Sequence, residues 1–427
     1  MSRPRQTDQP HQDPARRPGP GRRQLLVAGA AGAGALGVGG AAFGLDRALR
    51  GAGPDSFSTG SGPGDEPFLH GSEAVPFYGE HQAGVETPAQ ASATVVGLDL
   101  REHVDREGII RMLRLLTDDA ARLTQGRPAL ADTEPELAQQ PARLTVTAGF
   151  GPGLLERAGV EVPQWLAPLP PFEIDQLRPE LGEGDLMLQI AADDPLTVSH
   201  AARMLLKDAR AFTAVRWVQN GFRRALGTQR PETTQRNLFG QLDGSANAVP
   251  GSAHFDKVVW IDEGPFAGGT SMVIRRIRMD LDGWDEVDRL ARENSTGTRL
   301  DTGAPLTGGD EFADADFSAV SAHGFPVIPE FAHMRRAHGI DEGEHQEIFR
   351  RAYHYDVPPP EGSESVSEAG QIFISFQADV KGQFVPIQQR LSDLDLLNQW
   401  TTPIGSAVFA VPPGCAEGEY LGQSVLE

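Results

Sequence analysis

The chain has 427 residues, of which 39% are hydrophobic and 23% are charged, and its formal net charge is −21. This composition is that of a globular protein of one large or two medium domains, and it excludes collagen, coiled coil and wholesale disorder. So acidic a chain does not suit phosphate backbones, which excludes nucleic-acid binding. Because Cys415 is the only cysteine, an intramolecular disulfide and a Cys-rich zinc or iron–sulfur site are excluded as well.

The first fifty residues differ from the rest in charge. They hold 8 of the 38 basic residues and 3 of the 59 acidic ones, so they carry +5 and the remaining 377 residues carry −26. The pair Arg22-Arg23 opens an apolar, Ala/Gly-rich run that continues to about Leu45, and this pattern resembles a twin-arginine export signal. A membrane anchor is the alternative, since the run is about as long as the roughly 20 residues of a spanning helix. Residues 1–50 are therefore predicted to be a signal region.

Residues 51–74 are rich in Gly, Ser, Pro and Asp and predict a flexible linker. An N-terminal domain is expected over residues 75–235. β-branched runs and helical spacing of apolar residues predict strands at Ala93–Leu100, Arg143–Gly149, Asp185–Ala191 and Ala214–Phe222, and helices at His103–Leu123 and Leu196–Phe212. The resulting order, β-α-β-β-α-β, is that of a ferredoxin-like sheet with helices on one face.

A similar order is expected to return in a C-terminal domain over residues 236–427, giving an α+β protein of two ferredoxin-like domains. Strands are predicted at Lys257–Ile261, Thr270–Met279, Gln371–Gln377 and Ser406–Val411, and helices at Trp284–Asn294 and Leu391–Trp400. The stretch Ser295–Pro360 fits neither period and is far longer than a normal loop, which predicts a functional excursion. It contains five of the eleven histidines.

One candidate site lies in the segment Asn237–Asn247, where Asp243 stands in a short turn between Gly240 and Gly244. Glycines on both sides let the backbone approach something flat or bulky, and they leave the carboxylate presented from a rigid loop. An Asp-Gly pair is also the usual sequence of a hairpin turn, so a purely structural role is the alternative.

A second candidate site lies in the excursion, where His333 follows an apolar pair and two arginine pairs, 335–336 and 350–351, follow it. This pattern predicts a helical ligand to a metal, with a core histidine beside a solvated basic face as the alternative. A further alternative is a site for copper or another ion formed by the five histidines of the excursion, His323, His333, His338, His345 and His354.

Together these segments resemble the dye-decolourising haem peroxidases, in particular the exported branch of that family. Six motifs occur in the family's order: Val75–Gly84, the Asp243 loop, Gly268–Trp284, the His333 segment, the Arg350 segment and Gly405–Gly414. The resemblance implies two ferredoxin-like domains, with one haem b per chain held mainly by the second domain. It also implies a peroxidase that uses hydrogen peroxide to oxidise phenolic or dye-like reductants through a ferryl intermediate.

The resemblance also assigns roles to individual residues. Asp243 matches the distal aspartate of the family's GxxDG motif, His333 the proximal haem ligand and Arg350 the distal arginine. It follows that Asp243 would carry a proton between the two oxygens of peroxide, and that Arg350 would stabilise charge on the leaving oxygen. Four further residues match positions along the haem: Gly244, Ser245, His338 and Phe373.

The sequence departs from the family's pattern at several positions near these residues. Gln241 and Ser245 stand where many relatives have an aromatic residue and a threonine, and Ala352 stands where a glycine is frequent. Arg351 is an alternative to Arg350 as the distal cation. The five tryptophans and four tyrosines are the available relays by which electrons would pass from large substrates at the surface to the haem.

Two other functions would use the same haem-binding residues. One is an exported haem-handling protein that releases iron, like a deferrochelatase, and the other is a redox partner in the maturation of a metalloprotein. The expected partners are hydrogen peroxide, a small aromatic or dye-like reductant and the twin-arginine translocon, while homo-oligomerisation is left open. Export would deliver the protein to an extracellular, cell-surface or periplasm-like space.

Overall fold

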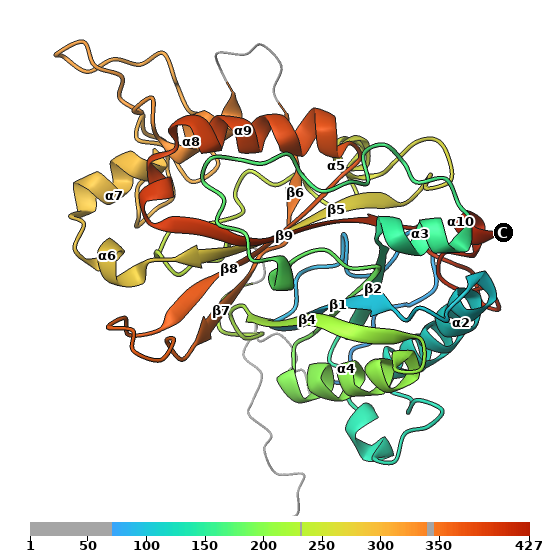
Figure 1. The fold of residues 1–427 in the computed structure, drawn as a ribbon. Coiled ribbons are helices and arrows are strands. Elements are labelled where there is room, and N and C mark those ends of the chain that lie inside the picture. Colours follow the sequence, from blue (N-terminus) through green and yellow to red (C-terminus); the bar gives the residue numbers. More distant parts are fainter. Residues whose placement is uncertain (1–70, 231–232, 340–345) are drawn as a thin grey trace, which may run out of the picture. The chain divides into compact units, whose positions relative to one another are not determined.

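The structure, a computed structural model, describes residues 71–230, 233–339 and 346–427 (Figure 1). The predicted signal region and most of the predicted linker lie outside these residues. In the part of the chain that is described, no helix combines the length and the apolarity that crossing a membrane requires.

The first half of the described chain contains four strands and three α-helices. Their bounds are β1 Ser92–Leu100, α2 Arg106–Leu123, β2 Thr145–Phe150, α3 Pro152–Ala158, β3 Leu186–Ala192, α4 Pro195–Ala209 and β4 Thr213–Phe222, with 3-10 turns at Pro135–Ala138 and Pro179–Leu181. Helix α2 begins where Asp105 accepts a hydrogen bond from the Gly108 amide at 2.8 Å, and α4 begins at the equivalent cap, Asp194. These bounds confirm the six elements predicted for this half to within a few residues.

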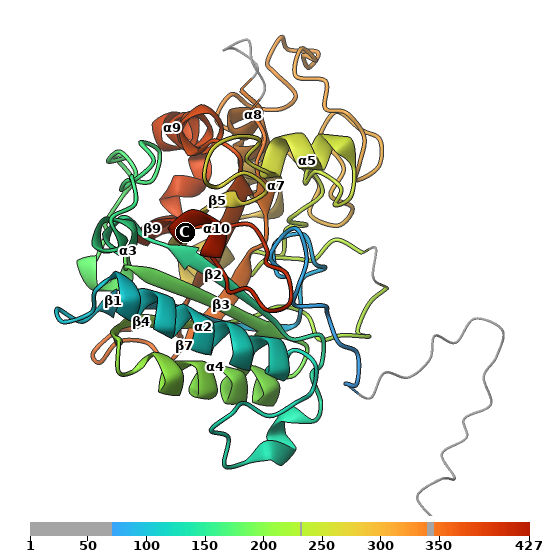
Figure 2. The ribbon, with the colours of Figure 1, turned by 90° about the vertical axis from the view of Figure 1, so that its right-hand side faces the viewer.

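The four strands form an antiparallel sheet in the order β4-β1-β3-β2. Helices α2 and α4 pack against each other and cover one face of this sheet (Figure 2). The apolar side of α2, which includes Ile109, Met112, Leu113 and Leu116, is buried in the core between helices and sheet. The opposite face of the sheet is turned toward the second half of the chain.

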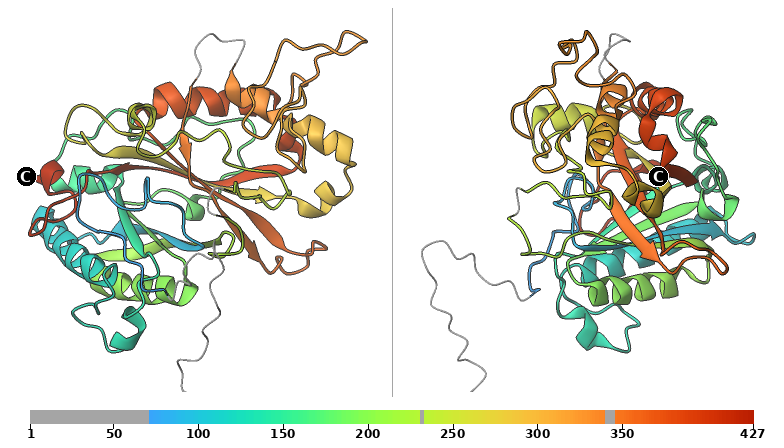
Figure 3. Two further views of the ribbon diagram at one scale, coloured as in Figure 1. Left: turned by 180° about the vertical axis from the view of Figure 1, so that it is seen from behind. Right: turned by 90° about the vertical axis from the view of Figure 1, so that its left-hand side faces the viewer.

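The second half has the same strand order with different connections. Its elements are α5 Ala253–Val259, β5 Thr270–Met279, α6 Leu281–Asp285, α7 Arg289–Thr296, α8 His333–His338, β6 Phe349–Arg350, β7 Tyr353–Val357, β8 Glu368–Gln377, α9 Val385–Leu394, β9 Thr401–Val411 and α10 Gln423–Leu426, with a π-helical turn at Val380–Phe384 and a 3-10 turn at Leu396–Gln399. The strands run β9-β5-β8-β7, and the short β6 also pairs with β8. Seen from behind, the segment between α7 and α8 lies beside these two helices (Figure 3).

One prediction for the second half was wrong, and two were wrong in part. The run Lys257–Ile261 is not a strand, because Ser252 caps a helix by accepting from the Phe255 amide at 3.1 Å, and α5 then buries Phe255, Val258 and Val259. The predicted helix Trp284–Asn294 is two helices, α6 and α7. The predicted helix Leu391–Trp400 ends at Leu394, and a 3-10 turn follows. The excursion contains β6 and β7, which complete the sheet.

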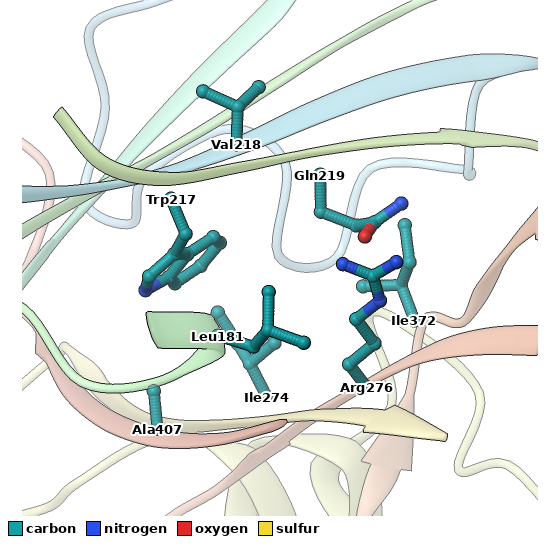
Figure 4. A pocket seen from close by; sticks show the side chains of 8 residues that line it. All are labelled: Leu181, Trp217, Val218, Gln219, Ile274, Arg276, Ile372 and Ala407. Carbon is teal, nitrogen blue, oxygen red and sulfur yellow. The ribbon is translucent and has the colours of Figure 1, made fainter. Parts of the chain in front are cut away.

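The two sheets face each other and are joined at both sides by a single residue pair, Phe150↔Ala410 between β2 and β9 and Phe222↔His354 between β4 and β7. Their inner faces bury a common apolar core. A small pocket at this inner layer brings Trp217 and Gln219 of β4 opposite Arg276 of β5 (Figure 4). It contains none of the predicted site residues, which lie on the other side of β8.

Candidate functional site

The loop after β4 presents Asp243. An isolated bridge pairs Arg236 with Leu242, and the Asn237 side chain closes the turn between them by accepting hydrogen bonds from the Phe239 and Gln241 amides at 3.0 and 3.2 Å. The turn precedes Asp243 and does not surround it, so the carboxylate emerges at the end of the hairpin. Gly244 then adopts a φ of 129°, a conformation that favours glycine.

Arg350 lies at the end of β6 and is fixed through its backbone. Its backbone carbonyl accepts a hydrogen bond from Nδ2 of Asn247 at 2.7 Å, and its backbone amide donates to Oδ1 of the same side chain at 3.1 Å. The guanidinium donates to Oδ1 of Asp243 at 2.7 Å, and the Gln371 amide donates to Oδ2 at 2.9 Å. Both carboxylate oxygens are therefore held, one by a cation and one by a neutral donor.

These contacts set the charge of Asp243. Burial alone would raise its pKa, but the Arg350 charge, the Gln371 hydrogen bond and the nearby His333 together lower the pKa below its ordinary value. Asp243 is therefore a carboxylate at neutral pH, which is the state in which it can accept a proton.

Arg351 does not share this site. Its side chain is fully buried and donates to the Thr87 carbonyl and to the Gln90 side chain. Successive residues of an extended chain point to opposite sides, and here that alternation sends Arg350 to Asp243 and Arg351 into the core between the halves. Of the two arginines, Arg350 is the one that contacts Asp243.

His333 is the first residue of α8, and Asp395 holds its ring. The Nδ1 atom lies 2.6 Å from Oδ2 of Asp395, a side chain that is only 4% exposed. Burial would lower the His333 pKa, but the charge and hydrogen bond of Asp395 raise it above its ordinary value. The Nε2 atom makes no hydrogen bond with the described part of the chain. A neutral ring fixed through Nδ1 in this way offers Nε2 as a metal ligand.

The protein offers a single histidine ligand here, which suits a metal ion whose other ligands belong to a cofactor. Among the described residues, no group of three or more His, Cys, Asp or Glu side chains is placed to hold a metal ion. His323, His333, His338 and His354 therefore form no such cluster, and His345 lies outside the described residues. One histidine backed by a carboxylate fits haem, whose porphyrin would supply the other ligands of the iron. His333, Asp243 and Arg350 are also close enough for their charges to act on one another.

The other predicted site residues lie around this centre. The Ser245 hydroxyl donates to Glu311 of the excursion at 2.7 Å. Phe373 lies on the same face of β8 as Gln371, and its ring centroid is 6.1 Å from that of Phe384. His338 lies at the other end of α8 from His333, with its ring 4.9 Å from that of Phe317.

The aromatic residues that could relay electrons differ in exposure: Tyr78, Trp165 and Trp400 are partly exposed, and the other six are buried. All five tryptophans and four tyrosines lie in the described residues, and each is buried or partly buried. Trp260, for example, is stacked on the ring of His81 at 3.7 Å and packs edge-on against Phe255. These contacts are those of packed aromatic residues.

Sequence reasoning missed the residues that position the three central side chains. Gln371 and Asp395 were not identified, and Asn247 was noted only as part of a local motif. Asp395 is 62 residues away from His333 in the chain, and Gln371 is 128 residues away from Asp243. Asp395 carries a local signal as the cap of the 3-10 turn, where it accepts from the Leu397 amide at 3.0 Å, but that signal does not indicate the histidine.

The chain is similar to known proteins over most of its length. Two family models match it, "Dyp-type peroxidase, N-terminal" over residues 82–223 and "Dyp-type peroxidase, C-terminal" over residues 234–416. It is 37% identical to the dye-decolorizing peroxidase of Thermobifida fusca, across 96% of this chain and 98% of that protein. It is 33% identical to a deferrochelatase of Yersinia pestis, across 96% of this chain and 95% of that protein.

A solved structure is also similar to this chain. The DyP-type peroxidase from Cellulomonas bogoriensis matches with a TM-score of 0.80 and 51% identity, across 84% of this chain and 99% of that chain. The fold and these likenesses define a haem-dependent peroxidase, an enzyme that reduces hydrogen peroxide with electrons from a second substrate. The chain belongs to the DyP-type, or dye-decolourising, peroxidase family.

Proposed function

We propose that the peroxidase reaction takes place between His333 on one side and Asp243 with Arg350 on the other. When bound, haem supplies a redox-active iron to which peroxide binds. His333 would bind this iron through Nε2, with Asp395 keeping the ring in one orientation and making it a stronger donor. The observation that carries this proposal is the Asp243–Arg350 contact of 2.7 Å, made close enough to His333 for their charges to interact.

Asp243 and Arg350 act on peroxide in different ways. Asp243, held as a carboxylate, takes the proton from one oxygen of peroxide and delivers it to the other, which leaves as water. Arg350 cannot lose its proton at physiological pH, so it acts as a fixed positive charge beside the departing oxygen. Gln371 and Asn247 keep the two groups aligned, the first at the carboxylate and the second at the arginine backbone.

Substitution of these two residues tests the assignment. We expect Asp243→Asn to slow the reaction with peroxide by about 10² to 10⁴, because the variant has no base, and Arg350→Leu by about 10² to 10³. The measurement is stopped-flow absorbance of the haem-loaded protein after peroxide addition. Asp193→Asn is the matched control, since it changes the carboxylate of another Arg–Asp pair, the one with Arg143. A wild-type rate in Asp243→Asn would overturn the assignment.

The second substrate is proposed to be a phenolic or dye-like reductant. The family match supports electron donors of this kind, and the net charge of −26 outside the first fifty residues favours cationic or neutral donors over anionic ones. Steady-state rates with a cationic and an anionic dye of similar potential, measured at low and high salt, test the charge effect.

A second candidate function is release of iron from haem. It is favoured by the 33% identity to proteins named deferrochelatase, which extends over 96% of this chain. Chromatography of the porphyrin extracted after anaerobic incubation with haem and a reductant separates the two functions. Iron-free porphyrin formed in stoichiometric amounts would support iron release, whereas unchanged haem together with peroxide turnover would leave peroxidase activity as the function.

The two halves are proposed to be ferredoxin-like domains over residues 75–235 and 236–427. The strand orders β4-β1-β3-β2 and β9-β5-β8-β7 support this, because each places the first and third strands of a half at its centre. Haem would be held mainly by the second half, which supplies His333, Asp395, Arg350, Asp243 and Gln371.

Export by the twin-arginine route is also proposed, from the pair Arg22-Arg23 and the apolar run after it. It would place the protein in an extracellular, cell-surface or periplasm-like space. Cell fractionation of the wild type and of a variant with both arginines changed to lysine tests this proposal, and equal export of the two would contradict it.

A further inference from the structure

His354 is a buried histidine beside the site that the roles proposed above do not use. It lies in β7, is 3% exposed, and neither ring nitrogen makes a hydrogen bond of good geometry with the described residues. Buried polar atoms are nearly always paired, either with protein or with ordered water, so two unpaired nitrogens on one ring call for an explanation.

The register of the sheet places His354 next to the group that holds Asp243. His354 lies directly opposite Gln371 in the β7–β8 pair, and directly opposed residues of antiparallel strands project from the same face with Cβ atoms about 5 Å apart. Gln371 in turn donates to Asp243 at 2.9 Å. The two titratable groups act on each other: Asp243 raises the pKa of His354, and His354 contributes to lowering that of Asp243.

The His354 ring also contacts Phe222 of β4. His354 is the residue that pairs with Phe222 across the junction of the two sheets, and the two rings meet edge to face with centroids 6.1 Å apart. Phe222 is 42% exposed. His354 therefore lies between the carboxylate of the site and a side chain at the protein surface.

The chemistry of the reaction requires a group in such a place. Full reduction of peroxide to two waters consumes two electrons and two protons, and Asp243 returns to peroxide the same proton that it removes. The two additional protons must come from outside the site, through a group that can both accept and donate. Four side chains lower the pKa of Asp243, namely Arg350, Gln371, His333 and His354. Arg350 and Gln371 do not exchange protons at physiological pH, and His333 is committed to Asp395.

We propose that His354 is the proton relay of the site, which takes up a proton at one ring nitrogen from the solvent side and releases one from the other nitrogen toward Asp243 across a bridging water. The step conserves protons, because the ring gains one and loses one and ends as the neutral imidazole. This inference depends on the role proposed for Asp243.

The surroundings keep His354 in the state that such a relay needs. Burial lowers the pKa of the ring most, the Asp243 charge raises it, and the Arg223 guanidinium lowers it. The net shift is downward, so the ring is neutral at pH 7, with one nitrogen able to donate and the other to accept.

Two variants and one matched control test the relay. His354→Gln keeps a polar side chain of similar reach that cannot pass a proton, and His354→Phe removes the polar atoms. His200→Gln is the control, since His200 is also buried but pairs with Asp132 at 2.9 Å in the other half of the chain. Haem content and circular dichroism verify that each variant is folded and loaded.

We expect both His354 variants to lower steady-state turnover about tenfold and to increase the solvent deuterium isotope effect, because protons then reach the site by a slower route. The reaction with peroxide itself, in which the proton stays within the site, should change less than about twofold. A readout independent of turnover is the pH titration of the resting absorption spectrum, whose midpoint should move in the His354 variants and not in His200→Gln.

The outcomes distinguish a failure of the His354 relay from a failure of the role proposed for Asp243. Wild-type turnover, isotope effect and spectral midpoint in His354→Gln would overturn the relay and leave the role of Asp243 intact. If Asp243→Asn loses the reaction with peroxide, while His354→Gln keeps that reaction but turns over slowly, the role of Asp243 and the relay are both supported. Unchanged peroxide reaction in Asp243→Asn would overturn the role of Asp243 and the relay with it.

Discussion

Two Arg–Asp pairs of nearly equal length, Arg143–Asp193 in the first half of the molecule and Arg350–Asp243 in the second, are used differently. In the first half Arg143 donates twice to Asp193, at 2.6 and 3.1 Å, and Asp193 also accepts from the Ala91 amide. In the second half Arg350 makes one contact with Asp243, at 2.7 Å, and Gln371 occupies the other carboxylate oxygen. The first pair is the more buried, with side-chain exposures of 15% and 8% against 26% and 17%.

The difference follows from the connections rather than from the sheets. Both halves have the same strand order, but one α-helix lies in each link between the first four strands (α2, α3 and α4 in turn), whereas the second half has the excursion after α7. That excursion supplies His333 and Glu311, and Arg350 follows at its end. Asp193, held by Arg143 and the Ala91 amide beside the ends of three strands, stabilises the fold, whereas Asp243 lies in the loop after β4 and meets Arg350 of the excursion through a single hydrogen bond.

The largest expected effect comes from breaking the pair in the first half. Asp193→Ala leaves Arg143 buried without its partner, so we expect the free energy of unfolding to fall by about 3 to 5 kcal/mol, measured by urea denaturation. The peroxide reaction rate per haem-loaded molecule should be unchanged. A rate that fell together with stability would contradict the division of roles between the two pairs.

A smaller effect is expected from Asp395→Asn in the second half. The variant keeps an oxygen for the Leu397 amide but loses the charge that raises the pKa of His333, so His333 becomes a weaker donor. Loss of such a partner costs about 10- to 100-fold in activity or metal affinity. Stopped-flow rates and haem titration measure both quantities. Asp393→Asn, on the exposed side of α9, is the control, and an equal loss there would refute the specific role of Asp395.

The smallest effect is a pH dependence in the first half. Burial and the neighbouring Asp119 raise the pKa of Asp208 to about 7. A raised carboxyl pKa stabilises the fold fully below pH 4, and this contribution is lost as pH rises through 7. Urea denaturation between pH 4 and pH 8 should therefore show a falling stability in the wild type and a flatter profile in Asp208→Asn. Parallel profiles would show that Asp208 is not the group responsible.

The first half was predictable from sequence because its strands and its two long helices show clear periodicity. The second half was less predictable. The β-branched run Lys257–Ile261 suggests a strand and does not reveal that Ser252 caps a helix that includes part of this run. The site was predictable only through its motifs. Asp243, His333 and Arg350 belong to recognisable local patterns, whereas Gln371, Asp395 and His354 acquire their positions from strand register and long-range packing.

The face-to-face arrangement of the two sheets has a consequence for behaviour in concentrated solution. The outermost strands of each half, β2 and β4 in one and β9 and β7 in the other, are paired across the two junctions, so their borders are directed at each other. Exposed strand borders are templates on which a foreign chain can add by backbone hydrogen bonding. Here each junction brings two borders together at one residue pair, so neither border is open to a foreign chain at that point.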